Sequence, residues 1–564
     1  MPFRDEVMAL LNYVGKGEVI AGSERDREVA EKLRGFFESI GLETKLIPIT
    51  CMSWSPRVSF VEIGNRELRA EALPYTPSGD VEGKLVFAGW GLYEREWRGV
   101  KAEDNIVLLE WFKDSLDDIN WQYMNAVAKG AKAVIFFDPY PNRLRRIVIT
   151  FERNYKWGPG APPPIPALVI ERSEGLRLVR RARRGVKVRV FSEVKLNHKA
   201  TTHIVEAGRR EGILLTAHYD RWFNGFTDNR LGVALVLALA KEFSDGVNYV
   251  IFGGEESGAP GYSPWYWIWG SRNYVSILKE RGELDEILAV VNIDVVGSSP
   301  IRINASGPDL IEGVKEVLNY NQTISYDLDS AIFDSFSFSK EGVPALTVNS
   351  LDQLLEIYHT DIDSEEIIIW TKVKEAYEVT RSILRSLIRK GSSILRYEAF
   401  RKYVEGELSY LKDKYQEAAK VIELIRGMSL DEEKARRLRR KLISVTYEGR
   451  YEETFLPFST TFLPQLLIKE DLKKVEKAEA LLKQGKLDKA IEVLRSIPDY
   501  RVIPGEERIL PYVNLRGALS NAKAVCLEHL LSEAKKAIEE AIKCSLVQLE
   551  DLIKMKGDEV AWRR

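Results

Sequence analysis

The sequence predicts an α/β protein with a mostly parallel mixed sheet flanked by helices, an inserted β-rich unit and an all-helical C-terminal part. Two observations lead to this class. Between residues 200 and 390, continuous apolar runs bounded by turn residues alternate with helical segments, a pattern typical of strands buried on both faces of a parallel sheet. After about residue 390, strand signals almost vanish and charged amphipathic stretches take their place.

Composition narrows the class of protein. At about 150 residues per domain, a chain of 564 residues corresponds to roughly three or four domains. Hydrophobic residues make up 45% and charged residues 29%, as in ordinary folded proteins. The 82 basic and 84 acidic side chains leave a net charge of −2, which argues against nucleic acid or a membrane surface as a partner.

Cysteine content and hydropathy suggest a compartment. Three cysteines are too few and too scattered for a disulfide framework, which favours a reducing environment. The N-terminal residues lack the apolar core of a secretory signal, and no run of about 18 apolar residues occurs. We therefore expect a cytoplasmic protein.

The chain divides into three expected domains. A helix is predicted over residues 24–40, with Ser23 as its cap and Gly41 as its stop. From about residue 70, short β-rich runs predict a separate unit that ends in a proline-rich loop and a basic helix. The predicted domains are residues 1–69 with 196–390, the insert 70–195, and the helical part 391–564.

Four strands are predicted in the main domain. They are GILLTA (212–217), NYVIFGG (248–254), ILAVVNI (287–293) and PALTVN (344–349). The nearly all-apolar segment 231–243 is predicted to be a buried helix between the first two. In parallel sheets, binding sites gather at the carboxyl ends of the strands.

Ionisable residues follow these strands. Taken singly, each has an ordinary role as a helix cap, a turn residue or a structural histidine. Taken together they would form a dense negative cluster, which is costly unless cations neutralise it or most of the groups stay in water. The candidates are His218, Asp220, Asp228, Glu255, Glu256, Asp294 and His359.

Two divalent ions would supply that neutralisation. Two zinc ions carry a charge of about +4, against −3 from Asp228, Glu256 and Asp294 with neutral histidines. A pair of ions about 3.5–4 Å apart can polarise a carbonyl group and activate water, so the chemistry indicated is hydrolysis. If one glutamate of the pair binds metal, the other can serve as the base. Asp220 is placed to orient the imidazole of His218 from behind.

Five motifs in this order resemble the co-catalytic zinc exopeptidases, which include bacterial leucyl aminopeptidases, glutamate carboxypeptidase II and the transferrin receptor. They are HYDRWFNGFTDNRLGVA, GGEESG, NIDVVG, FDSFSFSKEGVPAL and IYHTDID. The resemblance implies the zinc exopeptidase fold and assigns the site residues. His218 and Asp294 would bind one zinc, Glu256 and His359 the other, Asp228 would bridge them, and Glu255 would be the general base.

The resemblance extends to the other domains. Segments such as GDVEGKLVFAGWG and AVAKGAKAVIFF are similar to the protease-associated domain inserted in many members of the family, where a lid role or a purely structural role is open. The helical third resembles, in position and character, the helical domain through which the carboxypeptidase branch dimerises. A homodimer is the corresponding expectation.

Several residues near the motifs have open roles. Tyr358 could donate a hydrogen bond to an oxyanion or be an ordinary buried tyrosine. Arg221 and Arg272 could pair with a substrate carboxylate. The aromatic residues of 262–269 could line a pocket or pack against the neighbouring domain, and Asp334 stands where the family often has a polar turn.

The predicted function is a dinuclear zinc metalloexopeptidase acting on peptide or amide substrates, with cobalt or manganese as alternative metals. The choice between aminopeptidase and carboxypeptidase stays open, because it depends on which charged groups line the pocket. One alternative is a small-molecule amidohydrolase or deacylase on the same metal core. Another is a catalytically silent receptor-like or scaffold protein.

Overall fold

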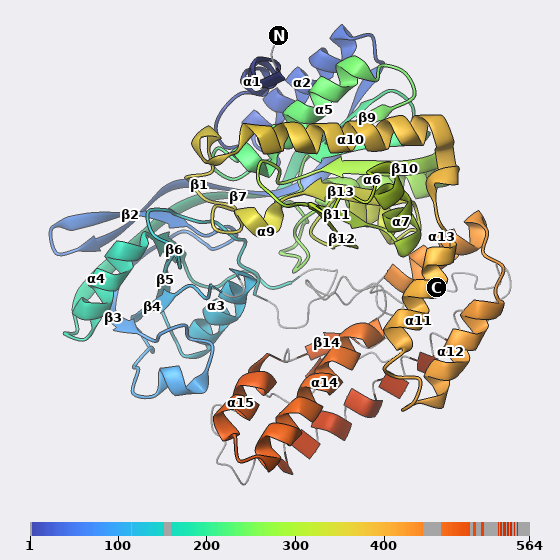
Figure 1. The fold of residues 1–564 in the computed structure, drawn as a ribbon. Coiled ribbons are helices and arrows are strands. Elements are labelled where there is room, and N and C mark those ends of the chain that lie inside the picture. Colours follow the sequence, from blue (N-terminus) through green and yellow to red (C-terminus); the bar gives the residue numbers. More distant parts are fainter. Residues whose placement is uncertain are drawn as a thin grey trace.

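The computed structural model describes residues 3–113, 116–151, 160–443, 464–496, 500–502 and 509–511, with part of 528–550. Within these residues, one 13-stranded sheet runs through the main body and the insert, in the order β1-β2-β6-β5-β4-β3-β7-β9-β8-β10-β13-β11-β12 (Figure 1). The C-terminal helices lie below the main body in this view. The predicted mixed α/β class is confirmed.

The four predicted strands form the centre of the sheet. They run parallel to one another in the order β9-β8-β10-β13. Nearly every residue in them is buried, which explains their continuous apolar sequences. The strands are β8 (Gly212–His218), β9 (Asn248–Phe252), β10 (Ile287–Ile293) and β13 (Ala345–Asn349).

Two strands at one edge of this sheet were not expected from the sequence. They are β11 (Ile301–Ala305), which is antiparallel to β13, and β12 (Ile324–Leu328), which is parallel to β11. Both carry polar residues inside the strand, such as Asn304 and Asp327. Because β12 is an edge strand with a half-exposed face, it lacks the apolar run that identified the others.

Helices cover both faces of the sheet, and neighbouring strand residues alternate between them. Leu215 and Ile251 pack in a core with α1, α2, α5 and α10, whereas Leu214 and Val250 pack against α6 on the other face. Ser23 caps α2 as predicted, accepting a hydrogen bond from the backbone nitrogen of Asp26 at 3.1 Å. The helices are α1 (Phe3–Val14), α2 (Glu24–Ser39), α5 (Leu231–Glu242), α6 (Trp269–Arg281), α7 (Pro308–Val317), α8 (Ser335–Ser339), α9 (Leu351–Leu354) and α10 (Trp370–Lys390).

Two long antiparallel strands, β1 (Thr44–Ile63) and β7 (Lys187–Ala207), continue from the main sheet into the insert (Figure 1). The predicted limit at residues 195 and 196 therefore falls inside one continuous strand. The remaining insert elements are β2 (Arg66–Ala72), β3 (Gly79–Phe87), β4 (Ile106–Glu110), α3 (Ile119–Ala128), β5 (Ala133–Phe137), β6 (Ala167–Ile170) and α4 (Arg172–Ala182). Its likeness to a protease-associated domain stays a prediction.

The C-terminal part is helical but not entirely so. A short antiparallel pair, β14 (Tyr500–Val502) and β15 (Ile509–Pro511), corrects the all-helical expectation. Part of the predicted helical part 391–564, including most of its last 60 or so residues, lies outside the described residues. The described helices are α11 (Glu398–Leu408), α12 (Gln416–Gly427), α13 (Glu432–Ile443), α14 (Pro464–Lys483) and α15 (Leu487–Arg495).

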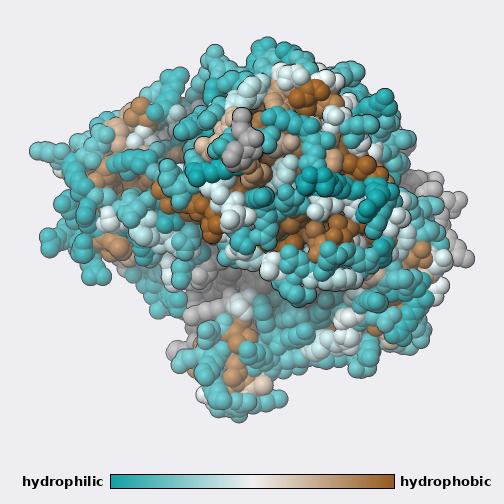
Figure 2. Space-filling model, turned by 45° about the horizontal axis from the view of Figure 1, so that its top comes forward, coloured by the Kyte–Doolittle hydropathy of each residue, from teal (hydrophilic) through white to brown (hydrophobic). Residues whose placement is uncertain are grey.

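The face shown in Figure 2 is mostly hydrophilic, with apolar residues in separate patches, as expected from the charged composition. Among the described helices, none is both long enough and apolar enough to cross a membrane. Homodimerisation stays a prediction.

Candidate metal centre

The site forms where the parallel strands end. His218 is the last residue of β8, Asp294 follows β10 directly, and Glu255 and Glu256 follow β9 after two glycines. Because parallel strands bring their carboxyl ends to one edge, side chains separated by up to 76 residues meet there. Two loops complete the group with Asp228, in the turn before α5, and His359, after α9.

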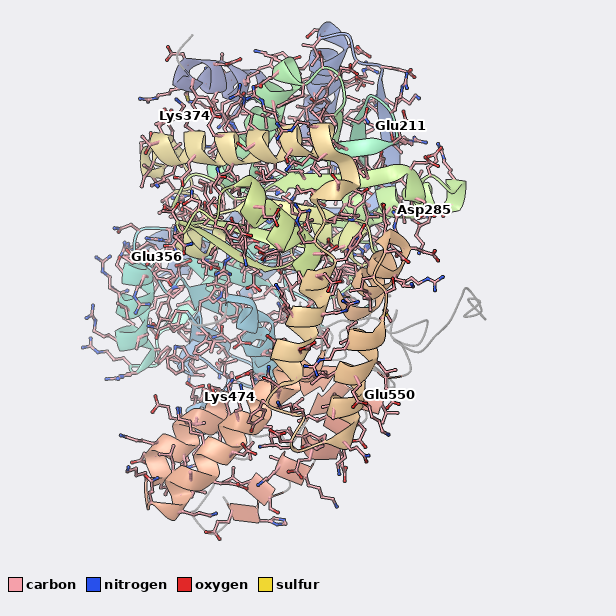
Figure 3. All side chains as sticks on the ribbon, turned by 45° about the vertical axis from the view of Figure 1, so that its right-hand side comes forward. Glu211, Asp285, Glu356, Lys374, Lys474 and Glu550 are labelled. Carbon is pink, nitrogen blue, oxygen red and sulfur yellow. The ribbon has the colours of Figure 1, made fainter. Side chains whose placement is uncertain are left out.

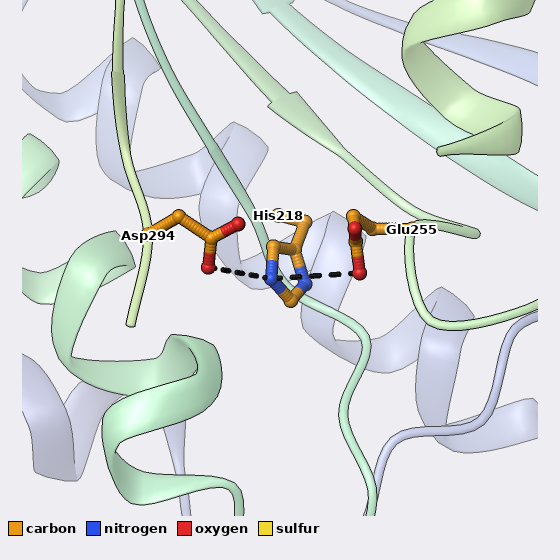
Figure 4. Close-up of side chains that lie close together, drawn as sticks. All are labelled: His218, Glu255 and Asp294. Atoms are coloured by element: carbon orange, nitrogen blue, oxygen red, sulfur yellow. Dashed lines mark hydrogen bonds and ion pairs between the residues drawn. The ribbon is translucent and has the colours of Figure 1, made fainter. Parts of the chain in front are cut away.

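One half of the cluster surrounds His218. Its Nε2 atom lies 3.1 Å from Oδ1 of Asp294 and 3.2 Å from Oδ1 of Asp228. The nearest oxygen of Glu255 is farther away, at 3.8 Å. In Figure 4 the imidazole of His218 lies between the carboxylates of Asp294 and Glu255.

The other half surrounds His359. Its Nε2 atom lies 2.8 Å from Oε2 of Glu256 and 3.3 Å from Oδ2 of Asp228. The two carboxylate oxygens of Asp228 therefore face different imidazoles, Oδ1 toward His218 and Oδ2 toward His359. This is the arrangement expected of a carboxylate that bridges two cations.

The side-chain atoms that could bind a metal ion at this site suit zinc. Four of them are buried and make no hydrogen bond of regular geometry within the described residues, although Nε2 of His359 and Oε2 of Glu256 lie 2.8 Å apart. They are Oδ2 of Asp228, both carboxylate oxygens of Glu256 and Nε2 of His359. Buried polar atoms in this state are costly unless a cation binds them. Imidazole nitrogen and carboxylate oxygen are ligands that zinc accepts. Among the residues that the structure describes, two groups of three have suitable spacing for an ion: His218 with Glu255 and Asp294, and Asp228 with Glu256 and His359.

Electrostatics point the same way. Burial raises the pKa of Glu255 well above its ordinary value, with further contributions from Asp294 and Glu256. Burial opposes a charged imidazole, but the carboxylates of Glu256 and Asp228 raise the pKa of His359 to about 10. Full ionisation of these carboxyl groups beside neutral imidazoles is thus costly for the protein alone, and divalent cations would offset that cost.

Asp220 supports the site in a different way from the one predicted. Its backbone carbonyl oxygen, not its carboxylate, lies 3.0 Å from Nδ1 of His218, while the carboxylate Oδ1 is 3.8 Å away. The carboxylate instead accepts hydrogen bonds from the backbone nitrogens of Glu255 at 3.0 Å and Glu256 at 3.1 Å. Asp220 therefore links the His218 strand end to the turn that carries both glutamates.

Tyr358 lies beside the cluster. Its ring stacks on the imidazole of His359, with ring centroids 3.6 Å apart. Burial, with the neighbouring carboxylates of Asp228 and Glu256, raises the pKa of Tyr358 well above its ordinary value, so its hydroxyl stays protonated and able to donate. Its role toward an oxyanion stays a prediction.

The two arginines differ from expectation. The guanidinium of Arg221 donates to the backbone carbonyls of Gly15, Gly17 and Tyr219 at 2.9–3.0 Å. That of Arg272 lies 3.6 Å from the centre of the Trp265 ring and donates to the carbonyl of Trp265 at 2.8 Å. The protein itself therefore engages both groups, contrary to the expected contact with a substrate carboxylate.

The aromatic segment 262–269 divides between packing and the site. Trp265 is fully buried in a cluster that also holds Phe336 and Phe400, so it joins the main domain to the helical part. Tyr266 is only partly buried and contributes to the electrostatic surroundings of Tyr358. Of the two roles left open by the sequence, Trp265 therefore has the packing role.

Sequence reasoning missed Asp363 near the metal ligands and left the role of Asp334 open. Asp363 is buried, and both its carboxylate oxygens accept a hydrogen bond from the backbone nitrogen of Thr227, next to Asp228. Asp334 is also buried, and burial raises its pKa to about 7 against the opposing effect of His218. Both lie in the motifs quoted above, but nothing in the sequence indicates their partners.

Comparisons with known proteins agree with the fold and with the resemblance found in the sequence. Residues 200–384 match the model of peptidase family M28, which confirms the predicted resemblance to co-catalytic zinc exopeptidases. A zinc aminopeptidase from Bacillus subtilis shares 19% identity over 68% of this chain and 93% of its own, with a TM-score of 0.53. A peptidase M28 precursor from Shewanella amazonensis shares 18% identity over 68% and 92%, with a TM-score of 0.56. At these identities the likeness shows the fold. No curated protein matches the chain.

Proposed function

We propose that this peptide hydrolase, which residues 200–384 identify with peptidase family M28, is a dinuclear zinc exopeptidase of aminopeptidase type. The observation that carries the proposal is the position of Asp228, whose two oxygens face two imidazoles among buried donor atoms without hydrogen bonds. His218 and Asp294 would hold one ion, and Glu256 and His359 the other. Zinc bound in this way polarises a carbonyl group and lowers the pKa of water.

Glu255 is the residue available for proton transfer. It lies at the cluster but farther from His218 than Asp294 does, at 3.8 Å against 3.1 Å. Its raised pKa favours taking up a proton, as a general base requires. The Glu255 carboxylate would accept the proton of the attacking water and deliver it to the leaving amine. The grouping of Glu255 with His218 and Asp294 also allows it to be a ligand, and metal content distinguishes the two roles.

Three observations support an aminopeptidase over a carboxypeptidase. A carboxypeptidase needs cationic groups for the terminal carboxylate, yet the two arginines expected for that task are engaged by backbone carbonyls. The acidic surroundings of the metal centre suit a substrate α-amine instead. The structural neighbour from Bacillus subtilis is a zinc aminopeptidase.

The test combines elemental analysis with hydrolysis of three dipeptide series: unblocked, N-blocked and C-blocked. We expect two zinc ions per chain and cleavage of unblocked and C-blocked dipeptides. Glu255→Gln should keep both ions and lose about 10²–10⁴-fold in kcat, whereas Glu286→Gln, at an exposed residue, should match the wild type.

Other outcomes point to other functions. Cleavage restricted to N-acyl amides would indicate the deacylase alternative. Bound metal without hydrolysis of any substrate would indicate a silent scaffold. Loss of zinc in Glu255→Gln would make Glu255 a ligand instead of the base.

A further inference from the structure

The insert reaches directly into the metal centre. Arg145 and Thr360 form an antiparallel bridge between the insert and the loop that carries His359. The backbone nitrogen of Arg146 donates to the carbonyl of His359 at 3.0 Å. In return, Nδ1 of His359 lies 3.2 Å from the carbonyl oxygen of Arg146. A backbone group of the insert therefore orients the imidazole of a candidate ligand.

The side chain of Arg145 holds the rest of this loop. It is fully buried and donates to three backbone carbonyls just before His359: those of Leu355 at 3.0 Å, Glu356 at 2.7 Å and Tyr358. Glu356 lies where the main body meets the insert (Figure 3). The guanidinium suits this task because it presents five donors in a rigid fork.

Asp138, at the end of β5, fixes the other side of Arg145. Its Oδ2 atom accepts from Nε of Arg145 at 3.0 Å, and both side chains are fully buried. The Nε atom is thus bound within the insert, and the two terminal nitrogens are directed at the carbonyls of the His359 loop.

The loop needs outside support. His359 has a φ of 59°, in the left-handed region that side chains other than glycine rarely adopt. Such a conformation persists only where the surroundings hold it. The carbonyl groups bound by Arg145 belong to the residues immediately before this position, so the guanidinium stabilises the turn that delivers the imidazole.

We propose that Arg145 is a positioning residue for His359, so that the inserted domain is a structural component of the metal centre. Arg145 acts through the backbone of residues 355–358 and not on the substrate. The part of this proposal that concerns zinc rests on the proposed function. The part that concerns the loop does not.

A purely structural role for Arg145 makes a different prediction. If its buried ion pair with Asp138 only stabilised the insert, Arg145→Lys would restore wild-type behaviour, because lysine keeps the positive charge. A lysine ammonium is a compact point charge on a flexible stem and cannot donate to Asp138 and three carbonyls at once. If Arg145 positions the His359 loop, Arg145→Lys should therefore not restore the wild-type behaviour of that loop.

The experiment compares Arg145→Lys and Arg145→Met with wild type and Arg189→Met. Arg189 is a matched control because it pairs with Asp80 and Glu62 within the insert strands, away from the His359 loop. Hydrogen exchange of the amides of 355–360 is measured in zinc-free protein. Zinc affinity is then measured by competition with a chelating indicator.

We expect faster exchange in 355–360 for both Arg145 variants. We also expect about 10–100-fold weaker binding of one zinc ion, with the other ion unchanged. Arg189→Met should resemble wild type in both measurements. Should Arg145→Met fail to fold, the hydrogen exchange and zinc affinity of Arg145→Lys test the proposal alone.

Wild-type exchange in 355–360 for Arg145→Lys would overturn the proposal. So would equal weakening of both zinc ions, since that would indicate a general loss of structure. If the wild type itself binds no zinc, the proposed function fails, whereas the exchange of the loop still decides the role of Arg145.

Discussion

The carboxylate of Asp363 holds the backbone nitrogen of Thr227 with both of its oxygens, at 3.1 and 3.0 Å. Thr227 precedes the candidate bridging ligand Asp228, and Asp363 lies four residues after His359. This contact joins the two loops that bring the non-strand ligands to the site.

Asp363→Asn should therefore loosen the bridging position. The amide offers one acceptor oxygen where the carboxylate offers two, and we expect about 10–100-fold weaker zinc binding. We also expect the free energy of unfolding to fall by about 1–3 kcal/mol, because a buried hydrogen bond is weakened.

Equilibrium dialysis and thermal unfolding measure the two effects. Asp352→Asn, at an exposed residue paired with Arg302, is the control, and equal zinc affinity in both variants would contradict the role of Asp363.

Asp220→Asn should disturb both glutamates together. The carboxylate accepts from the backbone nitrogens of Glu255 and Glu256, and an asparagine NH2 group would face one of these donors. We expect kcat to fall about 10–100-fold, with weaker binding of zinc. Kinetics at saturating zinc separate the two effects.

The control for Asp220 is Asp329→Asn. Asp329 is also fully buried, but it accepts from the hydroxyl groups of Ser335 and Ser339. This variant should lower stability and leave zinc binding at the wild-type level. The same loss of zinc affinity in both variants would show that any buried aspartate in this region has that effect.

Removing zinc should destabilise the protein. A ligand that binds only the folded state stabilises it by about 2.7 kcal/mol at 100 times its dissociation constant. A chelator should therefore lower the midpoint of thermal unfolding, and added zinc should restore it. Asp228→Asn, which alters the carboxylate shared by both halves of the cluster, should show a smaller difference between the two conditions. An identical midpoint with and without chelator in the wild type would rule out structural coupling to zinc.

Trp265→Ala should affect stability and not substrate choice. The side chain is fully buried between the main domain and the helical part, where it packs with Phe336 and Phe400. Removing a buried tryptophan side chain costs about 3–5 kcal/mol. Denaturant unfolding measures the loss, and KM at low temperature should stay at the wild-type value. A large change in KM with little loss of stability would place Trp265 in the substrate pocket. Tyr320→Ala, at an exposed aromatic residue, is the control.

The sequence predicted those helices and strands whose residues are almost all buried, because burial requires a recognisable run of apolar residues. The apolar run of α5 and the four central strands are buried on nearly all sides, so their sequences are apolar without interruption. Strand β11 and the edge strand β12 were missed because polar residues interrupt them. The short pair β14 and β15 was missed because three-residue strands leave almost no periodic signal.

The partners of the two arginines could not be predicted from the sequence either. Arg221 and Arg272 stand near the motifs in sequence, which suggested a substrate contact. Their partners are backbone carbonyls, and Gly15 lies 206 residues from Arg221. A carbonyl acceptor carries no mark in the sequence, because nearly every residue has one.

By itself the sequence determined which side chains gather at the site, because parallel strands bring their carboxyl ends to a single edge and the ionisable residues follow those ends. Only the tertiary structure decided which hydrogen bonds hold these side chains in place. The bonds from Asp363 to Thr227 and from Arg145 to Tyr358 span 136 and 213 residues. Such contacts exist only once the loops and the insert have docked, since docking alone selects which backbone group meets each buried charge.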